Sequence, residues 1–216
     1  MAGDAPAWDR WCREVFGDPY LVWHDGPDFA VLLERARADL DGVGRLLAAG
    51  LAARDPIAAQ SLGRLAAAGL LPDGAAGLLR AAATTATDTF LIRVAEALHA
   101  VTADPSWAGP IVGVLASATS GFVRLDAAIA LAGFPATRRL VEAAAGAVRD
   151  PEYLVRYHAA NTLLRYAGAA GDISDDRALF ARIATPAEGA PGDADRRSWR
   201  DAADELAARA LAGGPA

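Results

Sequence analysis

Several residue types that would indicate particular chemistry are scarce or missing in this chain. Its 216 residues include one cysteine, Cys12, which excludes an internal disulfide and a cysteine-rich zinc site. Lysine is absent, and the 21 arginines are outnumbered by 27 acidic residues, which gives a net charge of −6. Generic nucleic-acid binding needs a basic surface that displaces counterions from phosphates, so nucleic acid is an unfavoured partner.

Long apolar runs and export signals are also missing. The most apolar window, GPIVGVLASATSGFV, is shorter than the roughly 18 residues of a membrane span and is interrupted by glycines. The N-terminal sequence MAGDAPAWDRWCREV has no basic segment followed by an apolar one, so it does not resemble a secretory signal. We therefore expect a soluble cytoplasmic protein with no membrane partner.

Motifs for metals and nucleotides are not found either. The histidines, His24, His99 and His158, are far apart, and no HxxxH or CxxC spacing occurs. The stretch AGLLPDGAAGLLR lacks the pattern and the lysine of a phosphate-binding loop. The sequence therefore predicts no metal site and no cofactor. The glycines of GVGRLL, residues 42–47, indicate a helix break between Leu40 and Leu46.

Alanine supplies the dominant positive signal, because it makes up about a quarter of the chain and has the highest helix propensity. Segments that alternate with period two are few, so an all-α fold is predicted. Three segments then align: FLIRVAEALHAV, GFVRLDAAIALAG and YLVRYHAANTLLRYAG. Their arginines, Arg93, Arg124 and Arg156, are spaced 31 and 32 residues apart, and each follows an apolar pair.

These copies predict a repeated helical hairpin. A fourth, weaker copy runs from Asp55 to Gly69, and the segments between copies predict second helices. One hairpin cannot bury its apolar face alone, so the copies must stack and their ends need caps. We expect an aromatic N-terminal cap at residues 1–28, a repeat array at 29–184, a loop at 185–192, and a capping helix with its tail at 193–216.

The string DPEYLVRYHAANTLLRYAG resembles the HEAT and HEAT-like repeat family. The matching positions are Asp150, Val155, Arg156, Ala159, Ala160 and Leu163. The preceding copy matches at Val123, Arg124, Ala127, Ala128 and Leu131, but it has Ala118 at the position of the aspartate. The copy that contains Arg93 has Thr87 at that position. The resemblance covers roughly residues 50–184. It implies a right-handed α-solenoid of about four to five short hairpins.

The resemblance also implies a structural role for the arginines, because in this family the aspartate and arginine bond across turns and join neighbouring repeats. It predicts Asp150 as the partner of Arg156, since an unpaired charge in a core is costly. Glu96 and Asp88 are both available to Arg93.

A catalytic hypothesis rests on the same helix. His158, Asn161 and Arg165 lie at i, i+3 and i+7, so they share one helix face. Asp126 holds the position in the preceding copy that His158 holds in its own. Stacked repeats would bring the two side by side, where Asp126 could orient the imidazole of His158 for base catalysis or form an inter-repeat salt bridge.

The concave surface of a solenoid usually binds protein segments. We therefore predict a non-catalytic interaction module, an adaptor, scaffold or immunity-type inhibitor, whose partner is a protein or peptide. The alternative is a HEAT-like enzyme, either a small-molecule biosynthetic enzyme using His158 and Asp126 or a glycosylase for alkylated DNA bases, for which Trp107, Asp126 and Arg156 are the comparable set. Candidate binding residues are Arg93, Glu96, Trp107, Arg124, Arg138, Arg139, Arg156, Tyr157 and Asn161.

Overall fold

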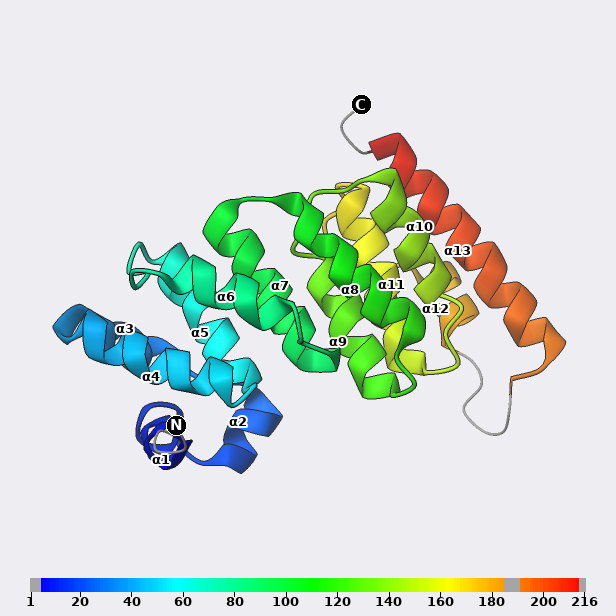
Figure 1. Ribbon diagram of the computed structural model, residues 1–216. Coiled ribbons are helices and arrows are strands. Elements are labelled where there is room, and N and C mark those ends of the chain that lie inside the picture. Colours follow the sequence, from blue (N-terminus) through cyan, green and yellow to red (C-terminus); the bar gives the residue numbers. More distant parts are fainter. Residues whose placement is uncertain (1–4, 185–190, 214–216) are drawn as a thin grey trace. The chain divides into compact units, whose positions relative to one another are not determined.

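The computed structural model describes residues 5–184 and 191–213, which fold into helices and contain no strand (Figure 1). This agrees with the all-α prediction. The chain divides into two compact units, Met1–Trp107 and Ala108–Ala216, and the boundary falls inside the predicted repeat array.

The first unit begins several of its helices after an aspartate. The carboxylates of Asp18, Asp39 and Asp55 accept hydrogen bonds from backbone N–H groups in the first turn, which stabilises a helix N-terminus. The helices of this unit are α1 (Ala5–Phe16), α2 (Pro19–Asp25), α3 (Ala30–Ala38), α4 (Leu40–Ala52), α5 (Pro56–Ala67), α6 (Ala75–Ala83), α7 (Asp88–Thr102) and the short 3-10 helix η1 (Pro105–Trp107).

Within this unit, α4 packs against α5 and α6, and α5 lies beside α7. The aromatic N-terminal segment packs on α4 through Trp8, whose side chain is 1% exposed. A Cβ atom added to Gly50 would lie 2.7 Å from the Trp8 ring, so glycine permits this close contact. The indole Nε1 of Trp8 also donates a hydrogen bond to Asp55 Oδ2 at 2.8 Å. Packing and this bond together attach the predicted cap to the start of α5.

The predicted helix break at residues 42–47 was wrong, because α4 continues through both glycines. Gly42 lies over the Asp39 carboxylate that caps the helix, and a Cβ atom there would collide with it. A Cβ atom on Gly44 would lie 3.0 Å from the Pro72 side chain. These glycines therefore serve close packing at one helix end and do not interrupt the helix.

The second unit contains two hairpins that lie side by side. Its helices are α8 (Ala108–Ser117), α9 (Gly121–Leu131), α10 (Arg138–Ala147), α11 (Tyr153–Tyr166), the short 3-10 helix η2 (Ile173–Asp175), α12 (Arg177–Ile183) and α13 (Asp193–Gly213). The α8–α9 and α10–α11 hairpins pack through α9 against α11 and through α8 against α10. Two side chains of α11 bond across to α9: Thr162 Oγ1 donates to the Ala128 carbonyl at 3.1 Å, and Tyr166 Oη to the Leu131 carbonyl at 2.6 Å.

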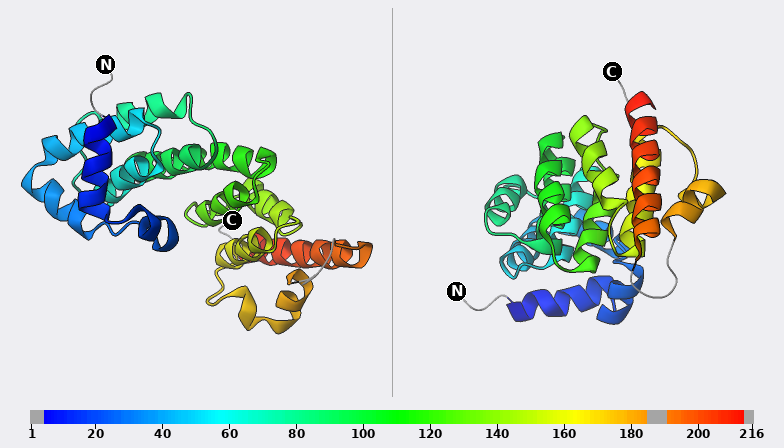
Figure 2. Two further views of the ribbon diagram at one scale, coloured as in Figure 1. Left: turned by 90° about the horizontal axis from the view of Figure 1, so that it is seen from below. Right: turned by 90° about the vertical axis from the view of Figure 1, so that its right-hand side faces the viewer.

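The last long helix, α13, covers the second hairpin. It packs against both α10 and α11, as the red and orange helix in Figure 2. Helix α12 follows the last copy, and α13 is the helix that packs along the second hairpin. Its buried residues recur on one face, which explains this role: Trp199, Ala202, Ala203, Leu206 and Ala210.

Some predictions fall on residues outside the described ranges. They are the first four residues of the predicted cap, most of the predicted loop (185–190) and the last three residues of the tail. The side chains of residues 1–6 and 23–25 are likewise outside the description.

Candidate functional site

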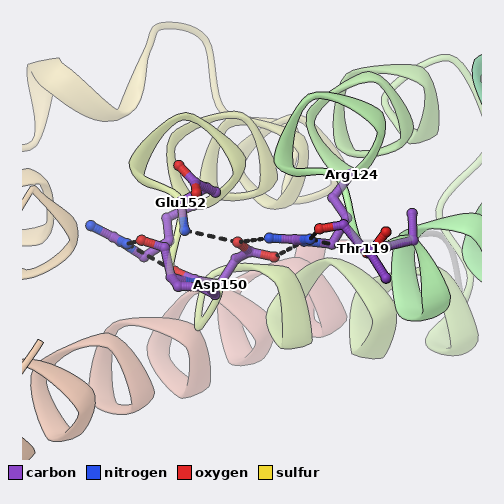
Figure 3. Close-up of polar contacts among 7 residues, drawn as sticks. Thr119, Arg124, Asp150 and Glu152 are labelled. Carbon is purple, nitrogen blue, oxygen red and sulfur yellow. Dashed lines mark hydrogen bonds and ion pairs between the residues drawn. The ribbon is translucent and has the colours of Figure 1, made fainter. Parts of the chain in front are cut away.

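The Arg124 guanidinium joins the two hairpins of the second unit (Figure 3). Its Nε donates to Asp150 Oδ2 at 2.6 Å and its Nη2 to Asp150 Oδ1 at 3.0 Å. Its Nη1 donates to the carbonyl oxygens of Ala118 and Thr119, each at 3.0 Å. The bond with Asp150 raises the pKa of Arg124 above its ordinary value. The guanidinium therefore links the chain just after α8 to the turn that precedes α11.

Arg156 repeats this arrangement one hairpin later. Its Nη1 donates to the carbonyl oxygens of Asp150 at 2.8 Å and Pro151 at 2.9 Å, and its Nε to the Ile183 carbonyl at 2.9 Å. Its guanidinium carbon lies 3.9 Å from the centroid of the Trp199 ring in α13. The side chain is 1% exposed, and burial lowers the pKa of Arg156 while the Asp150 carboxylate opposes that shift.

Both arginines therefore contact the carbonyls six and five residues before them and an acceptor 26 or 27 residues after them. The predicted contact between Arg156 and Asp150 is present, but it runs through the Asp150 carbonyl oxygen, because the Asp150 carboxylate binds Arg124 from the preceding copy. The cause is the position of Asp150 between the hairpins, where its carbonyl faces Arg156 and its side chain faces Arg124.

Two predicted binding residues of the first unit form an ion pair. Arg93 Nη1 lies 2.8 Å from Glu96 Oε2, one turn further along α7, so the contact with Glu96 is confirmed as one of the two that the sequence allowed. Trp107, in η1, is half-buried against the hydrophobic core of this unit.

A groove of about 580 Å³ lies between α8 and α10. Helix α8 has no charged residue along its ten positions, so its wall of the groove is uncharged. The charged residues of the groove are Glu142 and, in the part formed by neighbouring turns, Arg124 and Asp150, which neutralise each other. The full lining is Val112, Leu115, Ala116, Ala118, Arg124, Glu142, Ala143, Gly146, Ala147, Asp150 and Pro151. We refer to this set as the α8–α10 groove.

The predicted binding residues Arg138 and Arg139 open α10, one turn before the Glu142 of the α8–α10 groove. Both are exposed, and Arg138 lies 3.9 Å from Glu142, a surface pair of little energetic weight. Arg139 Nη1 lies 3.9 Å from the place where a Cβ on Gly109 would be, so it is beside the first turn of α8. Two cations therefore stand near one end of the groove.

A second groove, of about 350 Å³, lies between α9 and α11 and contains His158. His158, Asn161 and Arg165 all line it, which confirms that they share a helix face. Its described lining does not include Asp126, although α9 and α11 pack side by side as predicted. The carboxylate in this groove is Asp172. Partial burial lowers the pKa of His158, and the Asp172 charge opposes that shift.

Asp172 is the centre of a hydrogen-bonded cluster that the sequence did not reveal. Its carboxylate accepts from Tyr157 Oη at 2.7 Å, Asn161 Nδ2 at 2.7 Å and the Ser174 backbone N–H at 2.8 Å. Burial alone would raise the pKa of Asp172, but these bonds lower it to about 2. Asn161 Oδ1 also accepts from the Ile173 N–H at 2.7 Å. Tyr157 and Asn161, both predicted as binding residues, therefore hold the loop after α11 in place.

The spacing of two aspartates was the available signal for this cluster. In GDISDD, Asp172 and Asp175 form reciprocal side-chain bonds with each other's backbone N–H group at the start of η2. The signal was missed because such a pair predicts only a short turn, while Tyr157 and Asn161 reach it from more than ten residues away.

Other kinds of site find no support in the described residues. No group of three or more His, Cys, Asp or Glu side chains there could hold a metal ion. Within residues 5–184 and 191–213, none of the helices has the length and apolar character needed to cross a membrane. Burial raises the pKa of Cys12 to about 12, so its thiol stays protonated and unreactive at neutral pH.

No family model, curated protein or solved structure matches this chain. Its function is therefore inferred from its own geometry.

Proposed function

We propose that this chain is a cytoplasmic, non-catalytic protein-binding module, an adaptor, scaffold or immunity-type inhibitor. The α8–α10 groove is the observation that carries the proposal. It is concave, its α8 wall is uncharged, and its α10 wall consists of Ala143, Gly146 and Ala147 together with Glu142. Small wall residues leave room for the side chains of a partner segment, and a mostly apolar concave surface with a few polar groups is typical of binding sites.

The proposal includes a HEAT-like solenoid as the scaffold of this groove. The 32-residue spacing of Arg124 and Arg156 supports it, together with the equivalent carbonyls and forward acceptors that they bond. Under this hypothesis α8, α10 and α13 line one side of the array, and α9 and α11 line the other. A partner segment would then lie across the α8 and α10 side.

The state of the charged groups favours binding over catalysis. Arg124, Arg156 and Asp150 are engaged in bonds that connect hairpins, and Asp172 is engaged by three donors. These bonds hold the hairpins and the loop after α11 in fixed positions, and a binding surface needs such a fixed shape. His158 is the titratable side chain that an enzyme hypothesis would use, in the groove between α9 and α11.

Capture of partners from the native source, with the full chain as bait, tests this function. Gly146 lines the α8–α10 groove, and a Cβ atom there would meet nothing within 4 Å, so Gly146→Arg fills the groove without strain. Gly77 of α6 is equally exposed and unobstructed but lies outside the groove lining, so Gly77→Arg is the matched control.

The wild type and Gly77→Arg should capture the same protein, and Gly146→Arg should lose it. Retention of every captured protein by Gly146→Arg would refute the groove as the binding site. Failure to capture any partner, together with turnover of a small molecule that His158→Ala abolishes, would support the enzyme hypothesis instead.

A further inference from the structure

The outer face of α9 and α11 carries large apolar side chains that are open to solvent. Phe122 is 79% exposed, Leu154 50% and Ile129 42%. Phe122 and Leu154 are the second residues of α9 and α11, which pack side by side, so they occupy equivalent places on neighbouring helices. Ile129 lies two turns after Phe122 on the same face of α9. We call these three residues the outer patch. Large apolar side chains that are exposed on one face of neighbouring helices are features of interaction sites on soluble proteins.

The outer patch has an acidic residue, Glu152, at one end and a basic residue, Arg165, at the other. Asp126 lies between Phe122 and Ile129 on the same face of α9, and Asp172 lines the groove that contains Arg165. Glu152 immediately precedes α11, and its Cγ lies 2.7 Å from the place of a Cβ on Gly121, next to Phe122. Arg165 is in the last turn of α11 and lines the same groove as Ile129.

Neither charge has a hydrogen-bonded partner among the described residues, although the Glu152 charge acts to raise the pKa of Arg124 and of Arg156. The side chains of Glu152 and Arg165 form no hydrogen bond or ion pair with any described residue. Figure 3 shows no dashed line between the Glu152 carboxylate and the neighbouring Arg124–Asp150 pair. The two ends of the patch are therefore complementary to each other in charge.

We propose that the outer patch binds the outer patch of a second copy of this chain, in an antiparallel two-fold contact. In such an interface the same surface meets itself, so each end of the patch faces the other end on the second copy. The 13 positions from Glu152 to Arg165 span about 20 Å of helix. A two-fold axis near His158, halfway between them, pairs Glu152 of each copy with Arg165 of the other.

This contact accounts for both the exposed apolar side chains and the opposite charges of the outer patch. It removes Phe122, Leu154 and Ile129 from water, and it forms two equivalent ion pairs. The charge balance of the second unit permits the approach, because residues 108–216 contain 12 arginines and 13 acidic residues, a net charge of −1 out of the chain's −6. Repulsion between two such surfaces is weaker than the net charge of the whole chain suggests.

Sedimentation velocity of the full chain, from low to high micromolar concentration, tests the proposal. We expect the wild type to form a reversible dimer and Phe122→Asp to stay monomeric. Leu78→Asp is the matched control, because Leu78 is 43% exposed but lies on α6 of the first unit, and it should dimerise like the wild type. Circular dichroism verifies that each variant is folded. A monomeric wild type, or a dimer unaffected by Phe122→Asp, would overturn the proposal.

A charge exchange tests the antiparallel geometry. Glu152→Arg and Arg165→Glu should each weaken the dimer, because each places like charges opposite one another. An equimolar mixture of the two single variants should dimerise again, since both contacts in the mixed dimer then pair opposite charges. No recovery in the mixture would refute the arrangement. Gly146→Arg, which fills the α8–α10 groove, should leave dimerisation unchanged, so this proposal can fail or hold independently of the proposed function.

Discussion

Replacing Asp150 by alanine should destabilise the second unit, because it removes the counter-charge of a largely buried arginine. The Arg124 side chain is 15% exposed and that of Asp150 9%. The substitution deletes the bonds from Arg124 Nε and Nη2 and the bond from the Glu152 backbone N–H at 2.8 Å, but leaves the carbonyls of Ala118 and Thr119 in place.

The size of the expected loss in unfolding free energy depends on the hydrogen-bond acceptors that Arg124 retains. Removing one partner of a buried ion pair typically lowers the free energy of unfolding by about 3–5 kcal/mol. Arg124 retains two carbonyl acceptors and some contact with water, so we expect a loss near the lower limit, about 3 kcal/mol. Asp150→Asn keeps the shape and one acceptor oxygen, and should cost roughly half as much, because charge-assisted bonds are about twice as strong as neutral ones.

Urea denaturation followed by far-UV circular dichroism measures these changes. Hydrogen exchange of the amides in α9 and α11 shows whether the loss is confined to the second unit, since two units need not unfold together. Arg138→Ala is the control, because its contact with Glu142 is exposed and should contribute less than about 0.5 kcal/mol.

The double variant Arg124→Met, Asp150→Leu adds a further test. An apolar replacement of both partners avoids an uncompensated charge, so it should be more stable than Asp150→Ala alone. The interpretation is refuted if Asp150→Ala and Arg138→Ala have the same urea midpoint, or if the effects of the two replaced partners are additive.

Three further predictions concern single residues. Arg156→Ala should lower the free energy of unfolding, because it removes the donor to three carbonyl oxygens and a buried acceptor left unsatisfied typically costs about 1–3 kcal/mol. Arg156→Lys should recover less than half of the loss, because an ammonium group cannot reach acceptors on two sides and stack on Trp199; an unchanged urea midpoint for either would contradict this. Asp172 has a pKa of about 2 in the fold, below the ~3.9 of an unfolded chain, so its stabilising effect is complete above pH ~4 and is lost as the pH falls towards 2. The melting temperature should therefore fall more steeply in the wild type than in Asp172→Asn as the pH is lowered between those values. Parallel plots of melting temperature against pH for the two proteins would contradict the stabilising role of the Asp172 cluster. Gly50→Ala should lower the melting temperature although alanine favours helices, since the added methyl group would lie 2.7 Å from the Trp8 ring; a melting temperature equal to or above that of the wild type would disprove this.

Much of the helical framework could be predicted from the sequence. The repeated arginines locate α7, α9 and α11, because each stands in an alanine-rich segment whose helix formation depends on neighbours within a few residues. The glycines of α4 misled the prediction, since their role is set by Asp39 and Pro72, which contact them from outside the helix.

The candidate sites were less accessible to sequence reasoning. The shared face of His158, Asn161 and Arg165 follows from helical spacing and is confirmed. The Asp172 carboxylate in the same groove belongs to a loop, and no local pattern shows which helix a loop will contact. Exposure could not be predicted either: Phe122 is open to solvent, while Leu91, at the equivalent place two residues before Arg93, is half-buried.

The sequence by itself determined that this chain is helical and that three similar segments each carry an arginine, at spacings of 31 and 32 residues. These properties depend on local propensity and spacing. Only the tertiary structure decided which acceptors the arginines use, that Asp150 serves Arg124 through its side chain and Arg156 through its carbonyl, and that Trp199 covers the last guanidinium. The physical reason is that hydrogen bonds and ion pairs depend on distances of about 3 Å between groups 26 or more residues apart, which packing alone brings together.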